Sequence, residues 1–472
     1  MSDSDARALT QRLARHELSS REDGYHPAIA GGRSGDWVSM NLGLVCTKIG
    51  SGATPRGGKD VYLPTGPYAL IRSQNVLNDG FLHEGLAYIG EQHASELNGV
   101  EVRDRDVLLN ITGDSVARAC QVDSRILPAR VNQHVAIIRP DPTKLDPGFL
   151  RYFLIYRETQ AKLLSWAGAG GTRNALTKAM IEAFDVQAPE DVSEQRAVAR
   201  ILGTLDDKIE VNRRMNETLE AIARALFKSW FVDFDPVCAK LEDRDTGLPQ
   251  DIADLFPDRL VESEMGKIPE GWEIFRLDRL ADHHTKSMSP LRSPEEEYEH
   301  FSIPAYDAGQ RPSIELGAAI RSNKTVVRED AVLLSKLNPR IPRVWMPANS
   351  KGRRQVCSTE FLVFTPRPPA SRSLLFALFV DQSFRALLKS MVTGTSKSHQ
   401  RVPPKALKTQ EVLAGSPRVF RVFGEIAGSL LARVLRNRSE VTTLAALRDT
   451  LLPKLISGEM RAREASKVEA VA

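Results

Sequence analysis

The chain has 472 residues, of which 42% are hydrophobic and 26% are charged, and its formal net charge at pH 7 is +4. This composition is typical of a globular protein with about two to four domains. A transmembrane helix is excluded because no run of about 18 apolar residues occurs. The four cysteines, Cys46, Cys120, Cys238 and Cys357, are isolated from one another, which excludes a C-x-x-C metal or redox site.

The N-terminal 36 residues are polar and charged, and they lack the apolar segment of a signal peptide. We therefore expect residues 1–36 to form a disordered tail, because they cannot bury enough apolar surface to offset the entropy of ordering. Because these residues lack the apolar segment of a signal peptide, we also expect the protein to stay in the cytoplasm.

Short apolar runs between glycines, prolines and polar turn residues predict β-strands in each half of the chain. In the first half the runs cover residues 68–71, 106–109 and 134–138, and in the second half they cover 331–334 and 361–364. Each half ends in a long helical pattern, over residues 193–231 and 419–456. Ser193 is in the right place to cap the first of these helices.

The two halves repeat each other at a nearly constant offset. Val107 in the run DVLL and Val332 in the run AVLL lie 225 residues apart, and Trp37 and Trp272, near the start of each half, lie 235 apart. The 225-residue offset recurs in the pairs Gly203 and Gly428, Leu205 and Leu430, Asn212 and Asn437, Leu219 and Leu444, and Leu226 and Leu451. Because chance rarely maintains one offset over so long a stretch, the sequence predicts a duplicated unit, a domain with an appended helix.

Both long helices carry a heptad repeat. The seam residues are Leu205, Asn212, Leu219 and Leu226 in the first helix and Leu430, Asn437, Leu444 and Leu451 in the second. Such a seam must be buried, and the obvious partner is the helix of the other half, although each helix could instead pack on its own domain. In the first helix we expect Ile201, Met215 and Ile222 on the alternate seam position. We expect Asn212 and Asn437 to set the register.

An acidic segment separates the two halves. Residues 233–270 contain 11 acidic and 4 basic side chains, a net charge of −7, so the rest of the chain carries +11. Basic portions attract phosphate, and an acidic connector is expected to face away from it. Because many basic proteins never bind DNA, this pattern alone assigns no function.

No catalytic motif is recognisable. Residues 50–60 resemble a phosphate-binding loop, but Ala53 replaces its first glycine and Asp60 replaces the Ser or Thr that holds Mg²⁺. Residues 338–340 (NPR) differ from the Asn-Pro-Pro-aromatic motif of adenine methyltransferases, and the adjacent His283 and His284 lack the spacing of a zinc-protease pair. No G-x-S-x-G or dinucleotide-binding motif occurs. The sequence predicts no catalytic residue, no metal and no cofactor.

Several segments resemble the specificity subunits of type I restriction-modification systems. Residues 201–209 (ILGTLDDKI) and their continuation to 227–234 (FKSWFVDF) resemble the central conserved helix of that family. The connector motifs at 245–249 (DTGLP) and 268–272 (IPEGW), and the ending at 451–458 (LLPKLISG), are similar to it as well. The resemblance covers about residues 37–460 and is most specific in the central stretch. The second half departs most, around residues 403–417.

The resemblance implies an α+β fold. Two mixed α/β target-recognition domains are joined by two long conserved helices that form an antiparallel coiled coil, with a pseudo-twofold internal repeat. The implied divisions are a tail at 1–36, a first target-recognition domain at 37–190, a central helix at 191–232, an acidic connector at 233–270, a second target-recognition domain at 271–410, a C-terminal helix at 411–460 and a tail at 461–472.

The resemblance also implies a non-catalytic function. Each domain reads one half of a bipartite site in double-stranded DNA, and the helices separate the domains and dock two methylation subunits. Those partners carry S-adenosylmethionine and methylate adenine, and restriction subunits join them in the full complex. Two other classes stay open at this point: a duplicated scaffold that binds proteins without contacting DNA, and an enzyme of unrecognised type.

Polar side chains in loops at strand ends are the DNA-binding candidates, because base recognition in the major groove needs paired donors and acceptors. Any one of them could instead be a solvated residue or a phosphate contact. The glycine-threonine loops at 168–174 and 394–400 are the best group, since both halves contain one and glycine permits close approach of the backbone. The candidates are Thr54, Arg56, Arg72, Gln74, Asn75, Asn110, Thr112, Arg118, Asn132, Gln133, His134, Thr172, Arg173 and Asn174 in the first domain, and Lys336, Asn338, Arg340, Arg343, Thr395, Ser396, Lys397, His399, Gln400 and Arg401 in the second.

Overall fold

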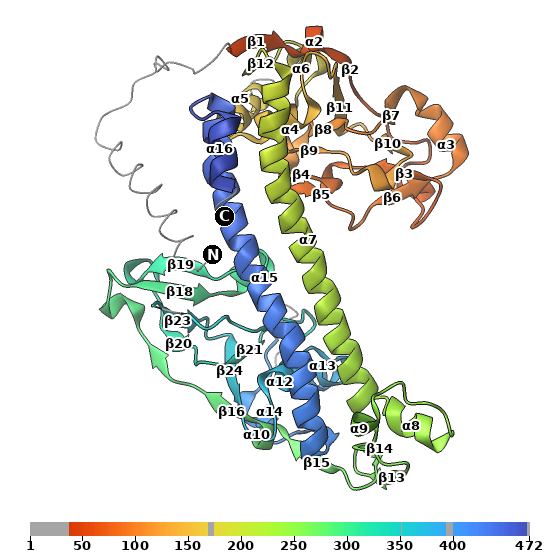
Figure 1. Cartoon of the computed structure of the whole chain (residues 1–472), viewed down its shortest axis with the longest axis vertical. Helices are drawn as coiled ribbons and strands as arrows, with labels where there is room; N and C mark the ends of the chain where they lie inside the picture. The colour runs from red at the N-terminus through yellow and green to blue at the C-terminus, as the bar shows by residue number, and fades with distance from the viewer. Residues whose placement is uncertain (1–36, 169–173, 351, 393–399, 470–472) are drawn as a thin grey trace. The chain divides into compact units, whose positions relative to one another are not determined.

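The computed structural model describes residues 37–168, 174–350, 352–392 and 400–469, and the expected N-terminal tail lies outside these ranges. The chain divides into two compact units. The first unit comprises the described residues up to Val211 and those from Glu440 onward, and the second comprises Asn212–Ser439. Two helices, α7 (Val192–Phe231) and α15 (Pro417–Ser457), each contribute one part to each unit (Figure 1).

The first unit is built on two four-stranded sheets. The central sheet has the antiparallel strand order β2-β11-β8-β9, and the outer sheet has the order β6-β3-β10-β7, in which β3 and β10 are parallel. The strands are β2 (Cys46–Ser51), β8 (Val107–Asn110), β9 (Ala119–Gln121) and β11 (Val135–Pro140), then β3 (Tyr68–Ile71), β6 (Ala87–Ile89), β7 (Glu101–Val102) and β10 (Ala129–Val131), with the smaller pairs β1 (Trp37–Asn41) and β12 (Asp185–Pro189), and β4 (Val76–Leu77) and β5 (Gly80–Phe81).

The central sheet of the first unit is buried on both faces. Val107 and Leu109 pack into a core shared with α4 (Pro147–Ile155) and α5 (Arg157–Gly168), whereas Leu108 packs into the core shared with the outer sheet. Since side chains alternate between the faces of a strand, burial of both faces requires a continuous apolar run. The remaining helices of this unit are α2 (Leu42–Val45), α3 (Glu91–Glu96), α6 (Lys178–Glu182) and α16 (Ala462–Glu469).

The second unit contains a corresponding set of elements. Its central sheet has the order β16-β24-β21-β22, and its outer sheet is five-stranded, β17-β20-β23-β18-β19. The elements are β15 (Glu273–Arg276) paired with β25 (Glu411–Gly415), β16 (Ala281–His284), β17 (Ser287–Met288), β18 (Glu297–Phe301), β19 (Ser313–Leu316), β20 (Lys324–Val326), β21 (Val332–Ser335), β22 (Val344–Trp345), β23 (Arg354–Cys357) and β24 (Phe361–Pro366), with helices α10 (Leu277–Leu280), α11 (Ile303–Asp307), α12 (Arg372–Val380), α13 (Gln382–Ser390) and α14 (Pro404–Lys408).

Strand register is the same in both central sheets. Val107 of β8 lies opposite Ile138 of β11, and Val332 of β21, which is 225 residues further along, lies opposite Phe364 of β24. The helices α12 and α13 also begin 225 residues after α4 and α5. The order of elements in space therefore follows the offset found in the sequence.

The acidic connector folds onto the second unit. It contains α8 (Asp235–Leu241), α9 (Gln250–Ala253) and the hairpin of β13 (Leu260–Ser263) and β14 (Gly266–Pro269). Its Phe256 lies edge-on to Trp230 of α7, with ring centroids 5.2 Å apart, and also contacts Trp272. The connector thus packs through a few aromatic side chains despite its negative charge.

Within each unit, the parts of α7 and α15 run antiparallel (Figure 1). In the first unit, Lys208 pairs with Glu440 and Asp206 pairs with Arg448, both at 2.9 Å. In the second unit, the Asn437 side-chain amide donates to Asn216 Oδ1 at 2.9 Å, and Phe227 meets Phe423 with ring centroids 5.8 Å apart.

Three expectations about the helices are wrong. Met215 and Ile222 do not occupy the alternate seam position, because they are 36% and 48% exposed. Asn437 hydrogen-bonds to Asn216 rather than to Asn212, and this bond allows the polar Asn216 to be buried where an apolar residue was expected. Ser193 lies inside the first turn of α7, and its backbone N–H donates to the carboxylate of the preceding Asp191 at 2.8 Å.

Candidate nucleic-acid interface

Backbone hydrogen bonds tie three loops together at one end of the central sheet in the first unit. The loops follow β8, precede β11 and lead into α6. The bonds run from Ile111 N–H to the His134 carbonyl (3.0 Å), from Gly113 N–H to the Asn174 carbonyl (3.1 Å) and from Leu176 N–H to the Ile111 carbonyl (2.8 Å). We call these segments, residues 110–118, 132–134 and 174–176, the strand-end loops of the first unit.

The second unit repeats this frame in residues 335–343, 358–360 and 400–402, its strand-end loops. The corresponding bonds run from Lys336 N–H to the Glu360 carbonyl (2.9 Å), from Asn338 N–H to the Gln400 carbonyl (2.8 Å) and from Val402 N–H to the Lys336 carbonyl (3.0 Å). Gly113 and Asn338, at equivalent places, have positive φ angles of 73° and 48°. The two units therefore share one backbone frame and differ in the side chains that it carries.

In the first unit the strand-end loops hold a chain of polar side chains. The Thr112 hydroxyl lies 2.6 Å from His134 Nδ1, and Gln133 Nε2 lies 3.1 Å from His134 Nε2. Asn132 Oδ1 accepts from the His134 backbone N–H at 3.0 Å, which fixes the turn between them. These groups offer donors and acceptors that could bond to base edges.

The loop after β2, which carries Thr54 and Arg56, is anchored beside these segments by a glycine. Gly52 N–H donates to the Asn132 carbonyl at 3.1 Å. A Cβ atom at Gly52 would lie 1.7 Å from the Val131 carbonyl oxygen, so no other residue fits this backbone. Thr54 and Arg56 follow this anchor two and four residues further along the chain, and their side chains are exposed.

Four of the candidate residues are buried, and all four form internal hydrogen bonds. Asn110 Nδ2 donates to the carbonyls of Ser73 (2.8 Å) and Val76 (3.3 Å), and Asn75 Oδ1 accepts from the Arg72 N–H (3.1 Å). Such bonds position the neighbouring loops and keep these amides away from the surface. The buried candidates are Asn75, Asn110, Asn132 and Arg343.

In the second unit the strand-end loops are charged. Arg401 bonds to Glu360 through two nitrogens, Nε to Oε2 at 3.1 Å and Nη2 to Oε1 at 3.0 Å. Lys336 is half-buried in the same frame. Burial, followed by the positive charges of Lys408, His284 and Lys336, lowers the pKa of nearby His283 to about 4. Burial is the larger cause, and the neighbouring Lys408 and Lys336 add a positive potential that suits a phosphate-bearing ligand.

The structure brings many, but not all, candidates to the surface of the two frames. Arg343 is an exception, because its guanidinium is fixed by Asp307 at 2.7 and 2.8 Å. The exposed candidates are Thr54, Arg56, Gln74, Arg118, Gln133, Asn174, Arg340 and Arg401, and the half-buried ones are Arg72, Thr112, His134, Lys336, Asn338 and Gln400. Thr172, Arg173, Thr395, Ser396, Lys397 and His399 lie outside the described residues.

Glu360 was not among the sequence-based candidates. A carboxylate is an unexpected group near a polyanion, and its contact with Arg401 spans 41 residues of sequence. Glu360 occupies the place of His134 in the first unit, but the two residues lie 226 apart, so the 225-residue offset of the sequence does not point to it. The two residues make equivalent backbone bonds, to Lys336 and Ile111.

A buried ionic cluster joins α4 to the long helices in the first unit. Asp206 accepts from Arg151 (2.6 Å), from the Tyr152 hydroxyl (2.7 Å) and from Arg448 (2.9 Å). Burial acts to raise the pKa of Asp206, but the two guanidinium groups and the hydroxyl outweigh it and hold the pKa below its usual value. The equivalent positions in the second unit are Phe376, Ala377, Leu431 and Ala223, all buried.

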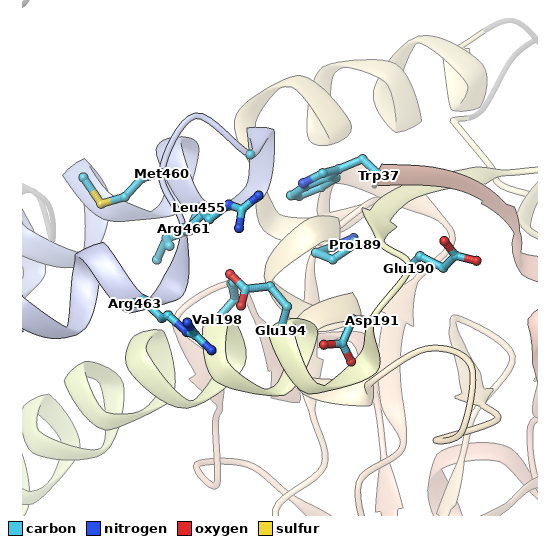
Figure 2. Close-up of a pocket in the computed structure, with 11 residues that line it drawn as sticks. Trp37, Pro189, Glu190, Asp191, Glu194, Val198, Leu455, Met460, Arg461 and Arg463 are labelled. Atoms are coloured by element: carbon cyan, nitrogen blue, oxygen red, sulfur yellow. The ribbon is translucent and has the colours of Figure 1, made fainter. Parts of the chain in front are cut away.

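A pocket of about 490 Å³ lies where α15 ends beside β1 and the start of α7 (Figure 2). Trp37 forms one wall, and a Cβ atom at Gly458 would lie 2.8 Å from its indole ring. Glu194, in the same wall as Val198, accepts from the Ala462 N–H at 2.9 Å. None of the candidate DNA-binding residues lines this pocket, which is a junction between helix ends.

Other types of site find no support in the described ranges. No group of His, Cys, Asp or Glu side chains there could hold a metal ion. Burial raises the pKa of the Cys46, Cys120 and Cys357 thiols to about 12, so these thiols are poor nucleophiles. No described helix is both long and apolar enough to cross a bilayer.

Comparison with known proteins points to one family. Residues 34–221 match the family described as "Type I restriction modification DNA specificity domain". The type I restriction enzyme HindI specificity subunit of Haemophilus influenzae is 24% identical over 473 residues, covering 90% of this chain and 100% of that protein. The MjaIX specificity subunit of Methanocaldococcus jannaschii is 25% identical over 322 residues, covering 66% of this chain and 69% of that protein.

A solved structure shares the fold. The S subunit of a type I restriction-modification system from M. genitalium aligns with a TM-score of 0.57 at 13% identity, covering 90% of this chain and 97% of that one. The family match, the two named relatives and the common fold agree with the motifs of the central helix. Over most of its length the chain is similar to specificity subunits of type I restriction-modification systems, and residues 34–221 match their DNA specificity domain.

Proposed function

We propose that this chain is the non-catalytic DNA-recognition subunit of a type I restriction-modification complex in the cytoplasm. Each unit reads one half of a bipartite double-stranded DNA target through its strand-end loops. The observation that carries the proposal is the shared backbone frame with different side chains, His134 in one unit and Glu360 in the other. A constant frame with variable side chains suits two domains that read different bases by the same mode of docking.

The long helices have a second role in this proposal. Together α7 and α15 form an antiparallel coiled coil that relates the units by a pseudo-twofold axis and acts as a spacer. They dock two adenine-methylating subunits, and restriction subunits join that core. Exposed Met215 and Ile222 on α7 support the docking role, because apolar side chains on the outer face of a paired helix suit a protein partner.

The test is an exchange of half the recognition surface. Replacing residues 272–400 by the same region of a relative should change one half of the methylated sequence in cells that also carry the methylation subunits. The matched control replaces residues 37–174 and should change only the other half. A change in both halves after either exchange, or in neither, contradicts independent reading.

A scaffold that never contacts DNA is distinguished by salt dependence. We expect the purified chain to bind duplex DNA with an affinity that falls steeply, and linearly on logarithmic scales, between about 50 and 200 mM salt, as phosphate neutralisation requires. An absence of DNA binding at the lower salt concentration would favour the scaffold.

A further inference from the structure

One arginine in the second unit is held unusually firmly for a surface loop. Arg401 engages the Glu360 carboxylate through Nε and Nη2, at 3.1 and 3.0 Å, while its side chain remains 44% exposed. Glu360 is 22% exposed and its backbone is fixed by Lys336. Bonding along the Nε–Nη2 edge fixes the plane of the guanidinium. The conformational entropy of this long side chain is therefore already lost before a ligand binds, which lowers the entropy cost of binding.

The position of this pair within the frame matters. Arg401 lies opposite Leu337 in an isolated β-bridge, and the corresponding bridge of the first unit joins Thr112 to Ala175. The first unit therefore has alanine where the second has arginine, and His134 where the second has Glu360. A pair with a purely structural role in the shared frame should recur in both units, whereas a pair that reads sequence should differ.

An oriented guanidinium suits one base best. Guanine presents O6 and N7 as two adjacent acceptors in the major groove, and bidentate contact with arginine is the commonest specific pairing. A phosphate contact requires no fixed plane, and Lys336 and exposed Arg340 in the same loops already supply positive charge for it.

We propose that Arg401, oriented by Glu360, recognises a guanine in the half of the DNA target read by the second unit. Arg401 is the specificity-determining residue, and Glu360 is a positioning residue that acts through it. The inference rests on the proposed function, because it assumes that the strand-end loops face DNA.

The experiment selects sequences from a randomised double-stranded DNA library with the full chain, and then measures binding to single-base variants of the selected duplex. The wild type should select a guanine in one half-site. Arg401→Ala and Arg401→Lys should lower discrimination at that one position by about 5- to 150-fold and leave the other positions unchanged. Glu360→Gln should weaken discrimination at the same base, an effect that a merely structural role would not confine to one position.

Arg353→Ala is the matched control, because Arg353 forms an exposed arginine–glutamate pair with Glu297 in the same unit, outside the strand-end loops. It should leave every base preference unchanged. Uniform weakening at all positions by Arg401→Ala, with a salt slope reduced by about one, would identify a phosphate contact and overturn the inference. Unchanged discrimination overturns it too. A wild-type chain that selects no sequence sinks the proposed function itself, and with it this inference.

Discussion

The ionic cluster around Asp206 leads to a quantitative prediction about stability. Arg448 and Asp206 have side chains only 16% and 14% exposed, and they meet at 2.9 Å. Removing one partner of a buried ion pair typically costs about 3–5 kcal/mol, because the other charge stays buried without compensation. For Arg448→Ala we expect a loss of about 3 kcal/mol, the lower end of that range, because Arg151 still neutralises Asp206.

A fourfold replacement should be far milder than the single one. The second unit fills the equivalent positions with Phe376, Ala377, Leu431 and Ala223. A chain with Arg151→Phe, Tyr152→Ala, Asp206→Leu and Arg448→Ala should therefore lie within about 1 kcal/mol of the wild type, since an apolar set of matching shape replaces a buried ionic cluster at little cost.

Urea unfolding at pH 7 measures these differences, with hydrogen exchange assigning the transition to the first unit. Lys208→Ala, which breaks the more exposed Lys208–Glu440 pair, is the control and should cost at most about 1 kcal/mol. The folded state lowers the pKa of Asp206, so its ionic stabilisation is complete above the unfolded pKa of about 4 and is lost as pH falls below it. An Arg448→Ala chain no less stable than Lys208→Ala would refute the reasoning.

Three further outcomes are expected. Folding lowers the pKa of His283 to about 4, so as the pH falls the unfolded chain takes up a proton on this side chain before the folded chain does. Stability should therefore rise by roughly 1–2 kcal/mol between pH 4 and 6.5, allowing for solvent screening, and His283→Gln should flatten that slope in urea titrations. Gly52→Ala should lower the melting temperature of the first unit and weaken DNA binding, because its Cβ would overlap the Val131 carbonyl. Gly50→Ala, with nothing within 4 Å of its Cβ, should do neither. Matched insertions of four residues after Asn212 and Asn437 lengthen both helices by about 6 Å, and mapping of methylated sites should show half-sites about two base pairs further apart; an unchanged gap in an active complex excludes the spacer role.

Local periodicity in the sequence determined much of the secondary structure. The predicted strand at 68–71 coincides with β3, and the strands predicted at 106–109 and 331–334 coincide with β8 and β21 to within one residue. The first predicted helix, 193–231, differs from α7 by one residue. These elements are predictable because a strand buried on both faces needs an unbroken apolar run, and a paired helix needs a seam every seven residues.

Only the tertiary structure decided which side chains meet. The heptad pattern predicted Met215 next to the seam, whereas the structure buries Asn216 there, where it accepts a hydrogen bond from Asn437. Asn110 is of a residue type that can contact DNA bases, but its side-chain amide is buried and donates to two carbonyls of another loop. The pairing of Arg401 with Glu360 likewise joins segments 41 residues apart. Burial and bonding of a polar group depend on partners far away in the chain, and periodicity carries no information about those partners.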